Sequence, residues 1–235
     1  MEDLPWLDAI VSRIVPPENA PSIDATVLWW VLAAALIACA VPIIWLRVRL
    51  GVTLVHELGH AFVGVMVGRK FNGFVLRGDM SGAAVTQGKP RGFGRVATTW
   101  AGYPAPAILG AALAWFAGRG WAAPTVTLLM LLLATAMIRV RSWLTAGVTL
   151  ISLAGFAALW WWRDDEVQAL VLIGIAILLV VGAWRHLGAV VTQPSPSSDP
   201  GVLAQLTRVP AFLWNLSFAV VCSLATWGVA QFFLP

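Results

Sequence analysis

Three ionisable side chains lie close together in the apolar segment Gly51–Gly68, namely His56, Glu57 and His60, in the pattern H-E-x-x-H. If this segment is helical, residues four apart lie on one face, so both imidazoles can reach one metal ion. Zinc is the usual metal for this pattern. Glu57 then flanks the metal, where it can take a proton from a water molecule bound to zinc.

The apolar surroundings of this motif favour a functional interpretation. A histidine on an apolar helix is more often a hydrogen-bonded core residue, and short motifs also occur by chance. Here, however, three ionisable groups fall within five residues of a segment hydrophobic enough to enter a bilayer. The more polar types cost roughly 2.5–3.5 kcal/mol each at that depth, and such residues are seldom kept without a role.

The composition of the whole chain indicates a membrane protein. Of its 235 residues, 60% are hydrophobic and only 11% are charged, and the apolar residues form long blocks. A bilayer core about 30 Å thick needs about 20 apolar residues per helix. We therefore predict an all-α polytopic membrane protein with about six to seven transmembrane helices. The net charge of +4 is modest, and the basic residues lie between apolar blocks, which excludes a nucleic-acid binder.

The chain divides into an amphipathic or irregular N-terminal segment, residues 1–24, and one transmembrane domain, residues 25–235. A tight turn is expected at Arg47 and Arg49, and a Pro/Ser-rich linker at residues 187–200. The expected spans are about 25–46, 51–68, 96–117, 122–138, 143–161, 167–184 and 210–233.

The longest polar insert, residues 69–95, has the pattern of a small β-hairpin. Residues 71–77 and 83–86 read as strands, and residues 78–82 as the turn. A hairpin beside a catalytic site could pair with an extended substrate, although an ordinary surface loop is an equal alternative.

Residues 101–106 form a thin, irregular start to the next span, since they combine small residues with two prolines. Irregular backbone at membrane depth needs a protein or water-lined neighbour, so this stretch is expected to pack near the metal. The two segments make Gly82, Gly102 and Tyr103 candidates for substrate binding.

The distribution of Lys and Arg predicts which side of the membrane carries the insert. Counted over alternate sides of seven spans, one side has eleven basic residues and the other has four. The richer side, which includes the insert, should be cytoplasmic. His60 lies nine residues before Arg69, about 13 Å along a helix, so the site should be sunk below that surface.

A catalytic zinc site usually has three protein ligands, so a third must come from elsewhere in the chain. Asp79 and Asp199 lie on the predicted cytoplasmic side, as does His186, which reads more simply as an interfacial side chain. Asp164 and Asp165 fall on the opposite side. Asp199 could instead cap a helix, because it follows Ser198 and precedes a proline.

The motif His56–His60 in an apolar helix, the basic hairpin and the Ala-Gly-Tyr-Pro helix start together resemble the site-2 protease family of intramembrane zinc metalloproteases. The compact bacterial branch is the most similar. This resemblance implies that the two histidines and a distant aspartate bind zinc and that Glu57 is the general base. The family's usual Asp-Gly pair is absent here. The compact branch instead carries a Ser-Asp pair that is followed by a Leu/Thr-rich turn, a proline and a tryptophan. This chain has a similar series in Ser198-Asp199-Pro200, Leu206-Thr207, Pro210 and Trp214. The resemblance therefore favours Asp199 over Asp79 as the third ligand.

The resemblance implies a zinc-dependent endopeptidase of a bacterial inner or plasma membrane. It would cut membrane-spanning protein substrates near the cytoplasmic face, within the lipid bilayer. The alternative is a catalytically inactive scaffold or regulator with the same fold. The intact Glu57 argues against this alternative, because a structural zinc site does not need the glutamate. A transporter has little support, because no span beyond the motif carries a buried charge and no repeat is visible.

Overall fold

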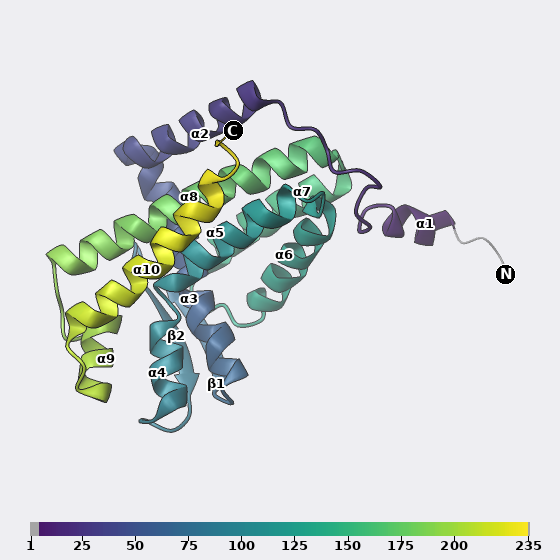
Figure 1. Ribbon diagram of the computed structural model, residues 1–235. Helices are drawn as coiled ribbons and strands as arrows, with labels where there is room; N and C mark the ends of the chain where they lie inside the picture. The colour runs from purple at the N-terminus through teal and green to yellow at the C-terminus, as the bar shows by residue number, and fades with distance from the viewer. Residues whose placement is uncertain (1–4, 235) are drawn as a thin grey trace.

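The computed structural model describes residues 5–234, so Met1–Leu4 of the predicted N-terminal segment and Pro235 of the predicted domain lie outside the described residues. The described chain is mostly helical, with one small two-stranded sheet (Figure 1). The elements are α1 Pro5–Val11, α2 Ala25–Ala40, α3 Pro42–Met66, β1 Lys70–Leu76, β2 Gly82–Gln87, α4 Phe93–Trp100, α5 Pro104–Ala117, α6 Ala122–Met137, α7 Trp143–Trp161, α8 Asp165–Thr192, α9 Asp199–Thr207 and α10 Ala211–Ala230.

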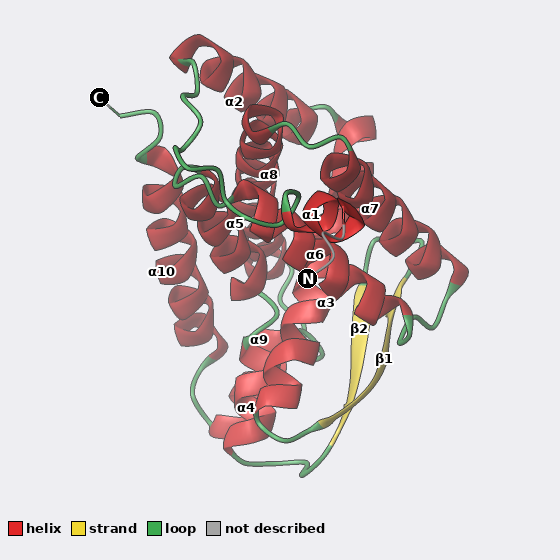
Figure 2. Cartoon of the chain, turned by 90° about the vertical axis from the view of Figure 1, so that its right-hand side faces the viewer, coloured by secondary structure: helices red, strands yellow, loops and turns green. Residues whose placement is uncertain are grey.

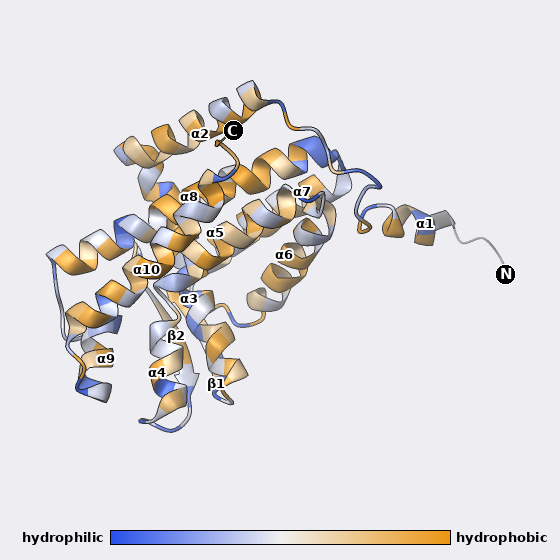
Figure 3. Cartoon of the chain, in the orientation of Figure 1, coloured by the Kyte–Doolittle hydropathy of each residue, from blue (hydrophilic) through white to orange (hydrophobic). Residues whose placement is uncertain are grey.

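Several helices suit a membrane. Within residues 5–234, α7, α8 and α10 are long and apolar enough to cross one, and α2 with α3 makes a fourth if the bent pair counts as one span. The helices α5 and α6 are apolar but shorter. Large apolar side chains such as Ile151 and Leu224 stay exposed on outer helix surfaces, as lipid contact requires, and Figure 3 shows apolar residues along the helices. The structure supports a multi-pass membrane protein but does not confirm six to seven spans.

The predicted boundary between the first two spans is wrong. Instead of a tight turn at Arg47 and Arg49, the chain breaks at Val41 and bends by 99°, and both arginines lie inside α3. The cause is Pro42, whose missing N–H and fixed φ suit the first turn of a helix and not its interior. Arginine is a good helix former, so nothing interrupts α3 at residues 47–49.

Two other predicted boundaries also move. The helix α8 continues to Thr192, so the linker before α9 is shorter than the predicted 187–200. Leu187 and Val190 are buried, and packing of these side chains extends the helix past Arg185 and His186. The predicted span 96–117 is divided by residues 101–103 into α4 and α5.

The centre of the molecule is α8, which packs against α2, α3, α5, α6 and α10. Its core face carries small and branched apolar residues, including Ala169, Leu172 and Ile173, which are completely buried. Small residues let neighbouring helices approach closely, which favours association in lipid. The helix α3 therefore packs against a helix that its other neighbours hold in place.

The predicted hairpin is confirmed within about one residue at each end. The strands β1 and β2 are antiparallel, and Leu76 pairs with Gly82 beside the turn. Phe74 and Leu76 are buried against Leu54 of α3 and Leu133 of α6. Figure 2 shows the hairpin beside α3. Burial of one strand face fixes the register, because a slip of one residue would turn these side chains outward.

Hydrogen bonds fasten the hairpin turn and its outer edge. Thr53 of α3 donates its hydroxyl hydrogen to the Met80 carbonyl at 3.2 Å, and the Leu76 N–H donates to the Thr145 hydroxyl of α7 at 2.7 Å. Thr53 lies one turn before Glu57, so the first bond brings the start of β2 over the motif. The hairpin is thus attached to the helix that carries the predicted chemistry.

Candidate metal centre

The two motif histidines and Asp199 meet in one small cluster. The Nε2 atoms of His56 and His60 are 3.1 Å apart, and each lies 3.2 Å from Oδ2 of Asp199. The histidines share a face of α3, as their four-residue spacing requires. Asp199 comes from α9, far along the chain. These three ligand atoms form the one group of at least three within residues 5–234 that could hold a metal ion.

The position of Asp199 is fixed by the packing of its short helix. Leu203 of α9 is completely buried in a cluster with Leu187, Val190 and Phe218. Ser198 occupies the N-cap position of α9, and Asp199 is the first residue inside the helix. Its carboxylate therefore does not serve as the helix cap, and it points to the histidines instead.

The hydrogen bond of His60 sets its tautomer. Its Nδ1 lies 2.7 Å from the backbone carbonyl of Thr98 in α4, and a carbonyl can only accept. Nδ1 therefore carries a hydrogen and donates it. In the neutral ring Nε2 then carries no hydrogen, and its lone pair is free to bind a metal.

The donor atoms fit a zinc ion. Two imidazole nitrogens and one carboxylate oxygen are among the ligands that catalytic zinc uses. Without a cation between them, lone pairs on the two nitrogens and the anionic oxygen would repel one another. Burial raises the pKa of Asp199, but neighbouring His60 and His56 outweigh this and hold the pKa of the carboxyl below its usual value. An ionised carboxylate is a suitable metal ligand.

The Glu57 side chain lies beside the cluster and is only 4% exposed. The backbone of Gly82, the first residue of β2, covers it so closely that a Cβ at Gly82 would overlap Oε1 and would lie 2.6 Å from Cγ of Glu57. The turn fastened by Thr53 thus brings the hairpin into direct contact with this carboxyl group.

The link between α4 and α5, residues 101–103, lies against the two histidines. A Cβ at Gly102 would overlap Nε2 of His60 and would lie 2.6 Å from Nε2 of His56. Only glycine, which has no Cβ, leaves room for both histidine nitrogens at this position. The Tyr103 ring packs edge-on against His56 with centroids 5.0 Å apart, and it stacks on Phe218 of α10 at 5.1 Å.

The family comparison decides what kind of protein carries this site. The family model for Peptidase M50B-like proteins matches residues 29–229, which include both motif histidines, Glu57 and Asp199. The chain belongs to the Peptidase M50B-like family. The resemblance to the site-2 protease family is thereby confirmed, and membership supports a membrane metalloprotease that acts on membrane-embedded substrates. No curated protein and no solved structure matches the chain significantly.

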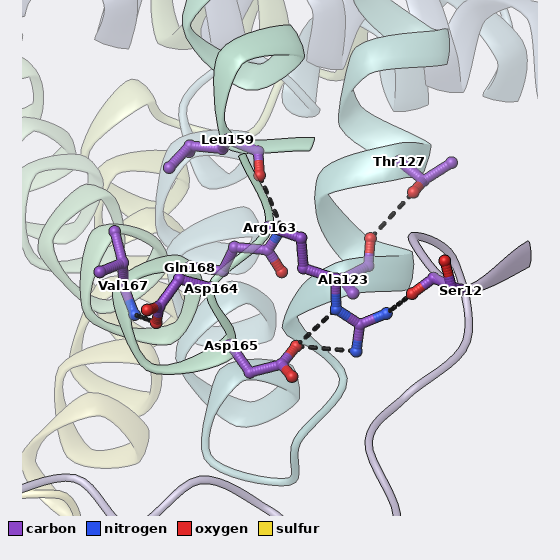
Figure 4. Close-up of polar contacts among 9 residues, drawn as sticks. All are labelled: Ser12, Ala123, Thr127, Leu159, Arg163, Asp164, Asp165, Val167 and Gln168. Carbon is purple, nitrogen blue, oxygen red and sulfur yellow. Dashed lines mark hydrogen bonds and ion pairs between the residues drawn. The ribbon is translucent and has the colours of Figure 1, made fainter. Parts of the chain in front are cut away.

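The other third-ligand candidates of this M50B-like protein lie elsewhere. Asp79 is exposed in the hairpin turn, where hydrogen bonds from the Ser81 hydroxyl and N–H lower the pKa of its carboxyl. Asp164 accepts from the Val167 N–H at the start of α8, and Asp165 pairs with Arg163 at 2.8 Å (Figure 4). All three carboxylates have structural partners of their own.

Sequence reasoning missed the part played by Thr98. This residue acts through its backbone carbonyl, so no side-chain type could have signalled it. Gly102 was singled out for substrate binding, and the structure places it directly against the ligand nitrogens. Its substrate-binding role, like those of Tyr103 and Gly82, stays a prediction.

We expect Gly102→Ala to weaken zinc binding by roughly 10-fold or more, since the new methyl group would displace both histidine rings. Equilibrium competition with a chelator on purified protein would measure the affinity. Gly147→Ala is the matched control, because nothing lies within 4 Å of its added Cβ. Wild-type affinity in Gly102→Ala would show that the rings have more freedom than these contacts allow.

Proposed function

We propose that this M50B-like protein is a zinc-dependent intramembrane endopeptidase. The convergence of His56 Nε2, His60 Nε2 and Asp199 Oδ2 beside a buried glutamate carries the proposal. A purely structural zinc site usually has four protein ligands. Three convergent donors and an adjacent carboxylate are instead the arrangement of a hydrolytic site.

Each residue of the cluster has a definite task in this proposal. His56, His60 and Asp199 hold the zinc, and Thr98 keeps His60 in the metal-binding tautomer. When bound, zinc supplies a Lewis acid that polarises the scissile carbonyl and lowers the pKa of a water molecule. Glu57 accepts the proton of the attacking water at its carboxylate and then delivers it to the leaving amine.

The hairpin gives an extended substrate a place to bind. Phe74 of β1 already exchanges backbone hydrogen bonds with Arg139 and Arg141, which cover part of the outer edge of β1. Within residues 5–234, β2 pairs with no strand other than β1, and side chains of Arg77 and Arg69 donate to the Gly82 and Thr86 carbonyls of β2. An extended substrate that displaced these side chains could pair with β2. A helical substrate must unwind to expose its carbonyls, and pairing with β2 would hold it unwound next to Glu57.

The charge distribution supports a site that opens toward the cytoplasm. Residues 69–95 carry six basic residues, five of them between α3 and α4, and the link between α6 and α7, which carries Arg139 and Arg141, contacts the hairpin. Basic residues gather on the cytoplasmic side of membrane proteins. Arg47 and Arg49, which were counted for the opposite side, lie within α3 and not in a link between two helices.

Metal removal tests the proposed activity directly. Purified protein in detergent should cleave an unstructured reporter such as labelled casein, should lose this activity on treatment with a zinc chelator, and should regain it when zinc is restored. Mass spectrometry of the products would locate the cleaved bonds. Full activity in protein verified to be free of metal would contradict the proposal, and tight zinc binding without any cleavage would favour the scaffold alternative.

A further inference from the structure

His186 of α8 lies next to the metal centre without belonging to it. Its ring centroid is 6.3 Å from that of His56, and the two ring planes are 69° apart. Nδ1 of His56 and Nε2 of His186 are both buried, and neither has a hydrogen-bond partner within residues 5–234. The other motif histidine, His60, does have a partner for its Nδ1, the Thr98 carbonyl.

The packing of α3 on α8 sets these two rings side by side. Val52 of α3 lies against Gly182 of α8, where an added Cβ would come within 2.9 Å of Val52 Cγ1. His56 and His186 each follow four residues later, one turn further along the same faces. Trp45 packs edge-on against His186 with centroids 6.5 Å apart, and Arg185 lies over the Trp45 ring at 4.1 Å.

The chemistry of a metal-bound imidazole makes this placement meaningful. When His56 binds a metal through Nε2, its hydrogen is on Nδ1, and an N–H buried without an acceptor is costly. Histidines that bind metals almost always donate this N–H to a carbonyl, a carboxylate or water. Nε2 of a neutral His186 is an acceptor of the required kind, and the ring separation suits one bridging water or a small ring rotation.

We propose that His186 is a positioning residue that accepts the Nδ1 hydrogen of His56, directly or through one water, and so fixes the ring that holds the metal. It plays for His56 the part that the Thr98 carbonyl plays for His60. This inference rests on the proposed zinc site, and it adds a requirement that the three ligands alone do not contain.

Zinc affinity of His186 variants tests the inference. His186→Phe keeps a ring of similar size and removes the acceptor, so zinc binding should weaken by about 10-fold or more. His186→Gln keeps an acceptor and should recover most of the affinity. Trp160→Phe is the matched control, since it also removes a buried ring nitrogen without a described partner, but beside Arg13. Thermal unfolding of the metal-free proteins would identify any variant that fails to fold.

The outcomes separate this inference from the proposed function. If wild-type protein binds no zinc, the metal site itself is wrong. If wild type and His186→Phe bind zinc equally tightly, the metal site stands and the role of His186 is wrong. Equal losses in His186→Phe and His186→Gln would indicate packing and would also overturn the role.

A measurement on unmodified protein remains decisive even if the variants unfold. The chain has only three histidines, so ¹⁵N-histidine NMR gives a simple spectrum. Zinc should shift Nε2 of His186 in the direction of a hydrogen-bond acceptor while His56 changes to its metal-bound form. A His186 signal that does not respond to zinc, while His56 and His60 do, would overturn the inference.

Discussion

Glu57→Gln should lower the rate of peptide cleavage by roughly 10²–10⁴-fold or more while zinc stays bound. The amide has nearly the shape of the carboxylate, so it fits under Gly82. It cannot accept the proton of the attacking water, and the three ligand atoms lie on other residues. The measurement pairs the initial rate of casein cleavage with the zinc content of the same preparation.

Glu166→Gln is the control for the loss of a glutamate charge, because Glu166 is exposed at the start of α8. It should cleave at the wild-type rate. Cleavage by Glu57→Gln at that rate would remove Glu57 from the mechanism. Loss of zinc from Glu57→Gln would instead mean that this carboxyl group helps to hold the metal.

Asp199→Ala should lose zinc, with an affinity more than about 100-fold below that of wild type, while Asp79→Ala should keep it. Removing Asp199 leaves two imidazoles to hold the ion, and catalytic zinc usually has three protein ligands. The change should spare the fold, since the Asp199 carboxylate does not cap α9 and buried Leu203 anchors the helix. Metal analysis of dialysed protein, with unfolding temperature measured in parallel, would show both effects.

Asp79→Ala is a stringent control, because it also removes an aspartate that was a candidate ligand. Its carboxylate bonds only to Ser81 within the described residues, so the expected cost is confined to the hairpin turn. Zinc lost from Asp79→Ala and kept by Asp199→Ala would transfer the third ligand to the hairpin. Such a result would mean that the hairpin reaches the histidines in the working protein.

The sequence by itself determined the features that depend on neighbouring residues. His56 and His60 share a helix face because four residues make about one turn, whatever the rest of the chain does. The hairpin was also predictable, since a Gly-rich turn separates two short strands. The apolar blocks determined the membrane class, because bilayer thickness sets the length of a helix that crosses it.

Only the tertiary structure decided how distant segments meet. The approach of Asp199 to the histidines depends on the packing of Leu203, more than 140 residues after the motif. The contacts of Gly102 and Gly82 depend on how α5 and the hairpin lie on α3, and a glycine looks the same in sequence whether it faces a metal site or lipid.

The same reason explains His186. Its sequence neighbours include no ligand partner four residues away, so the pattern showed an interfacial side chain. Its place beside His56 comes from the close contact of Val52 in α3 with Gly182 in α8, two residues that are 130 positions apart in the chain. Periodicity describes one helix at a time, whereas a site built between helices depends on long-range packing that no local pattern contains.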